Sequence, residues 1–336
     1  MNSLQNKTYI LKNKFELTIQ EEELDVSNLL DNEIVGQTIY SCVSPGTELA
    51  AYQGFPPLRP GMQYPRLMGY CNVGKVIKVG STSTGVSEGD VILTFTSHQK
   101  YFKIKANEVI AVLGRNIDYK LASAVYLFHL GYMATIESGA QPGMKVGVMG
   151  TGTLGYGTAL LCNQFGFKTH VFSNQVYLQD ELKADGISFS AKERIETQSY
   201  FNSFDIIINT SNSWEDWFLS MELLRKKGTM VNLGFPGRGL ALPEINPLDS
   251  RFFYDKQLTL KSAGYVYDGE ATVSDVQFSL KRNINYLLGL IAAGRLDPKR
   301  LISKEVKWEQ LSELYDFLLI RGTRKFTGIL NWTENA

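Results

Sequence analysis

The chain has 336 residues, of which 44% are hydrophobic and 20% are charged, as in an ordinary globular protein. At ~150 residues per domain, this length predicts about two domains. The 34 basic and 34 acidic residues cancel, which argues against nucleic acid or a membrane surface as a partner. Apolar runs are too short to span a bilayer. The polar first residues and three isolated cysteines predict a cytoplasmic protein without disulfides.

The first third of the chain has the pattern of a β-rich domain. Phe15–Gln20 alternates apolar and polar residues with period two, and Val73–Val79 and Val91–Phe95 are two further β-branched runs. The stretch 54–61 is rich in glycine and proline, which predicts a loop. We therefore expect short strands joined by turns over residues 1–120.

From residue 120 onward, predicted strands alternate with predicted helices. An apolar helix is expected over 120–137, a longer one over 275–293, and a returning tail with a helix over 308–319 and a strand over 326–332. Between them, the expected strands are 145–149, 168–172, 204–209 and 229–233, and the expected helices are 154–165, 175–184 and 214–224. Such alternation predicts an α/β fold, a Rossmann doubly wound parallel sheet with helices on both faces.

Three glycines follow the first of these strands, in the run Gly150-Thr151-Gly152-Thr153-Leu154-Gly155. In a dinucleotide-binding turn, the first glycine permits the sharp bend and the second lets the backbone approach a pyrophosphate. The third lets helix and strand pack closely. The N–H groups at the helix start favour the anion. The pattern predicts a nicotinamide dinucleotide site; the alternative is a glycine-rich turn that binds no nucleotide.

The end of the next strand bears on the choice of cofactor. An NAD-binding unit usually carries Asp or Glu about 20 residues after the first glycine, where it binds the ribose 2′-hydroxyl. Here the chain has Ser173-Asn174. Because a carboxylate would repel a 2′-phosphate whereas Ser and Asn can donate hydrogen bonds to it, we expect NADP(H) rather than NAD(H), although no Arg follows to pair with the phosphate. Further cofactor contacts are expected at the ends of the next strands, at Thr210, Leu233 and Gly234.

Several other segments match the motifs of one known superfamily. Pro45-Gly46-Thr47-Glu48 resembles a Cys-Gly-Ser/Thr-Asp segment, residues 67–76 resemble a Gly-His-Glu motif and its strand, and residues 88–92 resemble a Gly-Asp-x-Val turn. Together they resemble the medium-chain dehydrogenase/reductase superfamily, the alcohol dehydrogenase fold, over essentially the whole chain. The resemblance implies a GroES-like catalytic domain of residues 1–120 with 295–336, a Rossmann domain of residues 121–294, and a homodimer.

The metal ligands of that superfamily are not matched here. In its zinc members the metal sits on a Cys, a His and a third ligand; Pro45, Tyr70 and Tyr126 stand at these places, and Cys71 replaces the Glu after the His. Catalytic zinc needs three N, S or O ligands, which a proline and neutral tyrosines do not supply. Three cysteines also cannot provide the four of the structural zinc lobe. The chain therefore resembles the zinc-free branch, and Ser44–Glu48 resembles the bacteriochlorophyllide dehydrogenase-like group.

Without a metal, hydrogen-bond donors must stabilise the oxygen that gains negative charge. The resemblance gives Thr47 as the proton-relay hydroxyl. Tyr70 and Tyr126 would point into the space that the metal leaves, although either ring could only fill volume. Glu48 would orient its neighbours.

Two histidines each have two interpretations. His129, on the predicted helix 120–137, and His98, after the strand 91–95, could relay protons or could be core residues. The leading functional hypothesis is metal-independent hydride transfer to or from a carbonyl or alcohol of a small molecule. The alternatives are reduction of an activated C=C bond, as in quinone oxidoreductases, and a non-catalytic NADP(H)-binding protein.

Overall fold

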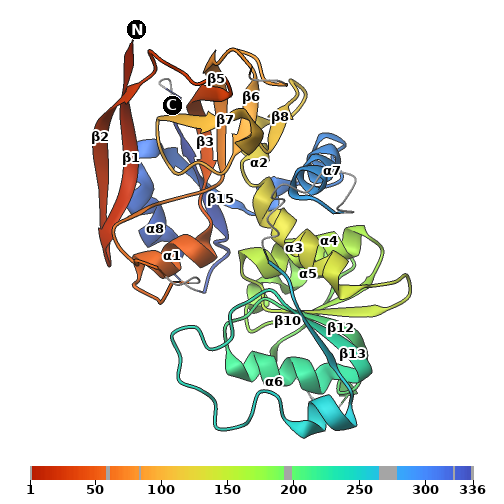
Figure 1. Cartoon of the computed structure of the whole chain (residues 1–336). Coiled ribbons are helices and arrows are strands. Elements are labelled where there is room, and N and C mark those ends of the chain that lie inside the picture. Colours follow the sequence, from red (N-terminus) through yellow and green to blue (C-terminus); the bar gives the residue numbers. More distant parts are fainter. Residues whose placement is uncertain are drawn as a thin grey trace. The chain divides into compact units, whose positions relative to one another are not determined.

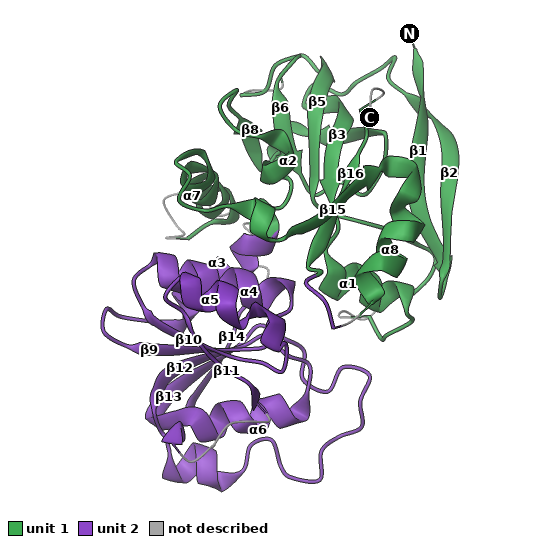
Figure 2. Ribbon diagram, turned by 180° about the vertical axis from the view of Figure 1, so that it is seen from behind, with its two compact units in different colours: residues 1–126, 267–321, 325–336 green, residues 127–266, 322–324 purple. Residues whose placement is uncertain are grey.

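The computed structural model describes residues 2–57, 61–82, 85–192, 199–264, 278–320 and 322–333. The chain divides into two compact units, which we describe separately (Figure 2). Unit 1 comprises Met1–Tyr126, Tyr267–Arg321 and Lys325–Ala336, and unit 2 comprises Leu127–Val266 and Gly322–Arg324. Among the described residues, no helix is both long enough and apolar enough to cross a membrane.

Unit 2 is built on a parallel sheet whose described strands lie in the order β11-β10-β9-β12-β13-β14. The strands are β9 (Lys145–Met149), β10 (Lys168–Phe172), β11 (Ser188–Ser190), β12 (Phe204–Asn209), β13 (Leu224–Asn232) and β14 (Thr259–Ser262). The chain runs outward from β9 in one direction and then restarts at β12 on its other side. This topological switch point is where open parallel sheets bind ligands, at the carboxyl ends of the strands. The predicted Rossmann doubly wound sheet is confirmed.

Helices cover both faces of this sheet, with α3, α4 and α5 on one face and α6 on the other (Figure 1). The helices are α3 (Val125–Ser138), α4 (Thr153–Gln164), α5 (Gln179–Ala184) and α6 (Trp214–Leu223), with shorter helical turns η2 (Val176–Leu178) and η5 (Arg251–Asp255). Because both faces are covered, the central strands β9 and β12 bury almost every residue, which explains their continuous apolar runs.

Two boundaries in this region differ from the prediction. The helix expected over 120–137 is two helices, α2 (Tyr119–Ala122), which the Asp118 carboxylate caps, and α3. The strand expected over 229–233 begins earlier, because β13 starts at Leu224 and runs through Lys227, which has a φ of 61° and whose N–H donates to the carbonyl of Lys256. The strand therefore continues past the bulge instead of starting after it.

Unit 1 is β-rich, as the first third of the sequence predicted. Its main sheet has the strand order β15-β16-β3-β5-β6-β8, with β7 also paired to β3, and a second sheet has the order β2-β1-β4. The strands are β1 (Ser3–Asn13), β2 (Glu16–Asp25), β3 (Glu33–Cys42), β4 (Arg66–Leu67), β5 (Asn72–Val79), β6 (Val91–Thr94), β7 (Tyr101–Lys105), β8 (Ala111–Leu113), β15 (Ile302–Lys307) and β16 (Thr327–Asn331). The tail thus adds β15 and β16 to a sheet that the first residues form.

The helical segments of unit 1 are α1 (Pro45–Tyr52), α2, α7 (Leu280–Ala292) and α8 (Leu311–Leu319), with single turns η1 (Ala106–Glu108), η6 (Pro298–Arg300) and η7 (Trp308–Gln310). Helix α7 groups with unit 1, whereas the sequence analysis assigned residues up to 294 to the Rossmann domain. The contacts explain this grouping, because α7 packs against β8 and the Lys281 ammonium donates to the carbonyl of Asn107. Residues 275–277 of the predicted helix lie outside the described residues.

Candidate active site

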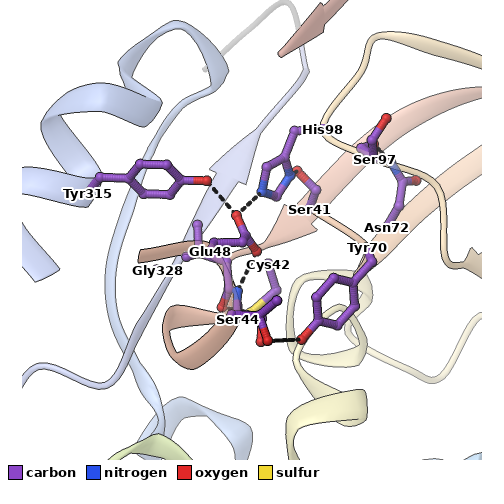
Figure 3. A network of polar contacts seen from close by, with 12 residues as sticks. Ser41, Cys42, Ser44, Glu48, Tyr70, Asn72, Ser97, His98, Tyr315 and Gly328 are labelled. Carbon is purple, nitrogen blue, oxygen red and sulfur yellow. Dashed lines mark hydrogen bonds and ion pairs between the residues drawn. The ribbon is translucent and has the colours of Figure 1, made fainter. Parts of the chain in front are cut away.

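A buried carboxylate lies at the centre of a polar network in unit 1 (Figure 3). Glu48, on α1, accepts a hydrogen bond at Oε1 from the backbone N–H of Ser44, 2.6 Å away. At Oε2 it accepts one from the Tyr315 hydroxyl at 2.6 Å and contacts Nε2 of His98 at 3.0 Å. Three donors therefore converge on one side chain that is only 3% exposed. A carboxylate held in this way is rigid, since breaking one bond leaves a buried polar group unpaired.

The partners of His98 indicate its tautomer. Its Nδ1 lies 2.8 Å from the Ser41 hydroxyl, and that hydroxyl oxygen accepts a hydrogen bond from the indole N–H of Trp332 at 2.9 Å. If Ser41 donates to Nδ1 and Nε2–H donates to Glu48, every proton in this series of hydrogen bonds has an acceptor. This arrangement places a ring proton on Nε2, facing Glu48.

Local sequence explains how these groups reach one place. Pro45 occupies the first position of α1, where its missing N–H costs nothing and its fixed φ suits the helix. Helix α8 buries Leu311, Leu314, Tyr315 and Leu318, which form one face of the helix and carry Tyr315 to Glu48. Gly69 has a φ of +85°, and a Cβ there would lie 2.6 Å from the ring of His98. The glycine thus makes room for the histidine.

Three hydroxyls and three aromatic rings form a second cluster beside this network, in which Ser44 and Tyr126 are buried and the other residues are partly exposed. The Tyr70 hydroxyl donates to Ser44 Oγ and lies 3.3 Å from Thr47 Oγ1. Its ring meets that of Tyr126 edge-on, with centroids 5.7 Å apart, and Tyr126 meets Phe95 in the same way at 4.8 Å. The expected residues Thr47, Glu48, Tyr70 and Tyr126 are therefore brought together. Burial raises the pKa of the Tyr70 phenol above its ordinary value.

This set of side chains does not fit the zinc that the fold family often carries. Pro45 has no donor atom, and the oxygens of Glu48 are taken up by protein donors. The thiols of Cys42 and Cys71 are both buried, and burial raises the pKa of Cys42 to about 12 and that of Cys71 well above its ordinary value. In the described part of the chain, no three His, Cys, Asp or Glu side chains are placed to share a metal ion. We derive no chemistry through a metal.

The glycine turn of unit 2 has the geometry that a dinucleotide requires. Gly150 has a φ of +92°, a backbone conformation that residues with a side chain rarely adopt. A Cβ on Gly155 would lie 2.1 Å from the carbonyl oxygen of Gly150. At Gly152, by contrast, a Cβ would meet nothing within 4 Å, so this glycine borders open space. Gly152 also forms the N-cap of α4 and offers no side chain of its own to the helix. Backbone N–H groups at Thr153 and Leu154 begin the helix there, and a pyrophosphate can approach them closely.

The hydroxyl of Ser173 holds this turn together instead of facing a ligand. It lies 2.6 Å from Thr151 Oγ1 and accepts from the backbone N–H of Gln175, while Thr151 donates to Gln175 Oε1. Because the one proton of Thr151 goes to Gln175, the proton of Ser173 goes to Thr151. Ser173 therefore has no proton left for a 2′-phosphate. Asn174 is exposed after the end of β10, and its contact with a 2′-phosphate stays a prediction.

The remaining predicted residues of unit 2 contribute less through their side chains. Thr210 donates its hydroxyl to the carbonyl of Met149 and closes the end of β9. Leu233 is buried in the apolar core beside β12, so its backbone alone can face a ligand. Gly234 packs against the backbone of Ser211, where a Cβ would be 2.3 Å from the carbonyl oxygen. His129 is buried on α3, in unit 2, and does not belong to the Glu48 network.

Sequence reasoning missed several members of these clusters: Ser41, Tyr315, Trp332 and Gln175. Tyr315 could have been found, because it stands at helical spacing with Leu311, Leu314 and Leu318 on a buried face. Ser41 and Trp332 are 291 residues apart in sequence, and no local pattern pairs them.

Comparison with known proteins gives dehydrogenases. The chain is 29% identical over 174 residues to cinnamyl alcohol dehydrogenase 7 of Arabidopsis thaliana, covering 50% of this chain and 46% of that protein. It is 32% identical over 114 residues to NADP-dependent alcohol dehydrogenase C 1 of Mycolicibacterium smegmatis, covering 33% of each. These alignments thus span from a third to about half of the relatives' length. No family model matches the chain.

Solved structures match over nearly the whole chain. L-idonate 5-dehydrogenase of Escherichia coli superposes with a TM-score of 0.81 at 16% identity, covering 98% of this chain and all of that one. A cobalt- and zinc-bound alcohol dehydrogenase of Pyrobaculum aerophilum gives a TM-score of 0.75 at 18% identity, again covering 98% of this chain and 100% of that one. The fold is that of the alcohol dehydrogenases, and the sequence relatives support the medium-chain alcohol dehydrogenase-like superfamily.

Proposed function

We propose that this chain, which has the alcohol dehydrogenase fold, is a metal-independent NADP(H)-dependent oxidoreductase. It would transfer hydride to or from a carbonyl or alcohol carbon of a small organic substrate. The observation that carries the proposal is the glycine turn, where Gly155 leaves no room for a side chain and Gly152 borders open space. A bound nicotinamide supplies or accepts the hydride. The chain's own residues then have to position the substrate and handle the proton.

Tyr70 is the residue we assign to the substrate oxygen. Its hydroxyl donates to Ser44 Oγ in the structure, and it would exchange this bond for one to the substrate oxygen, where negative charge develops. Thr47 and Ser44 hold the phenol from α1, and Glu48 fixes that end of the helix through the N–H of Ser44. Tyr126 supports the ring edge-on, which agrees with a packing role. His129 stays a candidate for proton relay within unit 2.

The test is steady-state turnover of NADPH with ketones, aldehydes and enones. Tyr70→Phe keeps the ring and removes the donor, so we expect kcat to fall by about 10²–10³. Tyr64→Phe is the matched control. It also removes a phenol hydroxyl in the same unit, one that donates a hydrogen bond to the carbonyl of Ala51. Equal turnover by both variants would remove Tyr70 from the mechanism. Activity with enones alone would favour C=C reduction, and tight NADPH binding without turnover would favour a non-catalytic binder.

Metal independence is supported by the donor set at Pro45, Tyr70 and Cys71, although solved neighbours include zinc enzymes. We expect no stoichiometric zinc in the purified protein and full turnover after dialysis against a chelator. About one zinc per chain by elemental analysis, lost together with activity, would refute this part of the proposal.

The NADP(H) preference is supported by the absence of an acid at Ser173-Asn174 and by the NADP-dependent relative. Asn174→Asp places a carboxylate beside the expected 2′-phosphate, so NADPH affinity should drop about tenfold or more while NADH affinity holds. Fluorescence titration measures both. Tighter NADH binding by the unaltered protein would contradict the preference. We also propose a homodimer in the cytoplasm, which light scattering and cell fractionation can check.

A further inference from the structure

Three residues form a closed ring of hydrogen bonds at the carboxyl ends of β9 and β10. The Thr151 hydroxyl donates to Gln175 Oε1 at 2.9 Å, and the backbone N–H of Gln175 donates to Ser173 Oγ at 3.1 Å. The hydroxyls of Ser173 and Thr151 lie 2.6 Å apart and complete the ring, with Ser173 as the donor. Because Thr151 belongs to the glycine turn, the ring fixes Gln175 to the segment that would hold a pyrophosphate.

The ring sets the orientation of the Gln175 amide. With Oε1 facing Thr151, each of the three protons in the ring has an acceptor. If the amide were turned, Nε2 would face Thr151, and the hydroxyl proton of either Thr151 or Ser173 would have no acceptor within the ring. Both hydroxyl residues are buried, so an unmade hydrogen bond there would be costly. Gln175 therefore presents Oε1 to Thr151 and directs Nε2 away from it.

The two protons of Nε2 remain available to a ligand. In the described part of the chain, the Gln175 side chain forms its hydrogen bond through Oε1, and Nε2 has no protein acceptor. The residue is partly exposed and Nε2 is not buried, so this atom reaches solvent. A rigidly held amide with two unused protons at an accessible position can bind an acceptor group.

Gln175 lies where a dinucleotide-binding unit recognises the adenosine ribose. It follows the end of β10, where Phe172 pairs with Met149 at the end of β9. In NAD-binding units, a carboxylate near this point accepts a hydrogen bond from the ribose 2′-hydroxyl. No acid occurs here between residues 173 and 179. The amide therefore supplies donors at a point where an NAD-binding unit would supply an acceptor.

We propose that Nε2 of Gln175 is a specificity-determining group, which donates hydrogen bonds to the 2′-phosphate of NADP(H). This assignment rests on the proposed function and deepens it. Hydrogen bonds to a charged phosphate are about twice as strong as those to a neutral oxygen such as the 2′-hydroxyl. Gln175 thus favours NADP(H) without the arginine that often accommodates this phosphate. Thr151 acts through Gln175 and is a positioning residue.

Fluorescence titration with NADPH and, separately, with NADH tests the assignment. Gln175→Glu keeps the shape of the side chain and exchanges the donor for a negative charge, so NADPH affinity should fall about a hundredfold. NADH affinity should hold or rise, since a carboxylate accepts from the 2′-hydroxyl. Gln175→Ala should lower NADPH affinity about tenfold and leave NADH affinity nearly unchanged.

Gln141→Glu is the matched control for the added charge. Gln141 is exposed in the same unit and precedes the amino end of β9, whereas Gln175 lies at the carboxyl ends of the strands. This variant should keep both affinities.

Thr151→Val tests the positioning role, because it removes the hydroxyl that orients the amide. It should weaken NADPH binding about threefold in the otherwise unaltered chain and cause no further loss in Gln175→Ala. A merely structural role for Thr151 would give the same loss in both backgrounds.

The assignment is overturned if Gln175→Glu binds NADPH as tightly as Gln141→Glu does. It is also overturned if Gln175→Glu and Gln175→Ala each lose NADPH and NADH affinity equally. If the unaltered chain binds neither dinucleotide, the proposed function fails and this assignment fails with it. Because the readout is binding, the result does not depend on which substrate the chain reduces.

Discussion

Two glycines of the same turn should respond to the same substitution in opposite ways. A Cβ on Gly155 would stand 2.1 Å from the carbonyl oxygen and 2.8 Å from the carbonyl carbon of Gly150. Both atoms belong to backbone, so the start of α4 must move by about 1 Å away from β9 to accept Gly155→Ala. A Cβ on Gly152 would meet no atom within 4 Å, and its φ of −66° suits alanine.

The magnitudes follow from these contacts. Overpacking against rigid backbone costs about 1–3 kcal/mol, and Gly155→Ala belongs at the upper end. In a unit of this size, each kcal/mol lowers the Tm by about 2–4 °C. Gly152→Ala should lower the free energy of unfolding by about 1 kcal/mol or less, since alanine is a poorer N-cap than glycine. Its methyl group would, however, occupy the space that a pyrophosphate needs, so NADPH affinity should fall more than tenfold.

Thermal unfolding and NADPH fluorescence titration of both variants separate the two effects. Gly289→Ala is the control, because it adds a methyl group in open space within helix α7 and should slightly stabilise the chain. The reasoning is refuted if Gly152→Ala binds NADPH like the unaltered protein, or if Gly155→Ala unfolds at the same temperature as Gly152→Ala.

Three further predictions concern stability. Tyr315→Phe removes one donor from the buried Glu48 carboxylate and should lower the free energy of unfolding in urea by about 1–3 kcal/mol; a loss below about 0.5 kcal/mol would contradict the network. Gly69→Ala combines a φ of +85° with a clash against His98, so it should lower the Tm and shift the imidazole resonances of that ring in NMR spectra; unchanged resonances would show that the ring is not packed there. Burial lowers the pKa of His170 to about 4, so the unfolded chain takes up this proton first as pH falls. Stability should therefore drop by up to about 3 kcal/mol between pH 6.5 and pH 4, and less in His170→Gln; parallel pH profiles would rule out this cause.

The sequence by itself determined the central strands and the glycine turn of unit 2. Strands β9, β10 and β12 were predicted to the residue, and β9 and β12 show why, because central parallel strands are mostly apolar runs. The dinucleotide turn was equally readable, since each glycine answers a local steric demand. The motif around Thr47 and Glu48 placed Tyr70 beside them through a resemblance, and the structure brings these side chains together.

Only the tertiary structure decided what those side chains bond to. Glu48 contacts His98 and Tyr315, which are 50 and 267 residues away in sequence. No periodic pattern in the sequence indicates such pairings. The hydroxyl of Ser173 was expected at a ligand, yet it turns inward because Thr151 and Gln175 use its hydrogen-bonding capacity. Local patterns report which face of a strand or helix is buried. Which acceptor a hydroxyl group donates its proton to depends on residues that folding brings together from distant parts of the sequence.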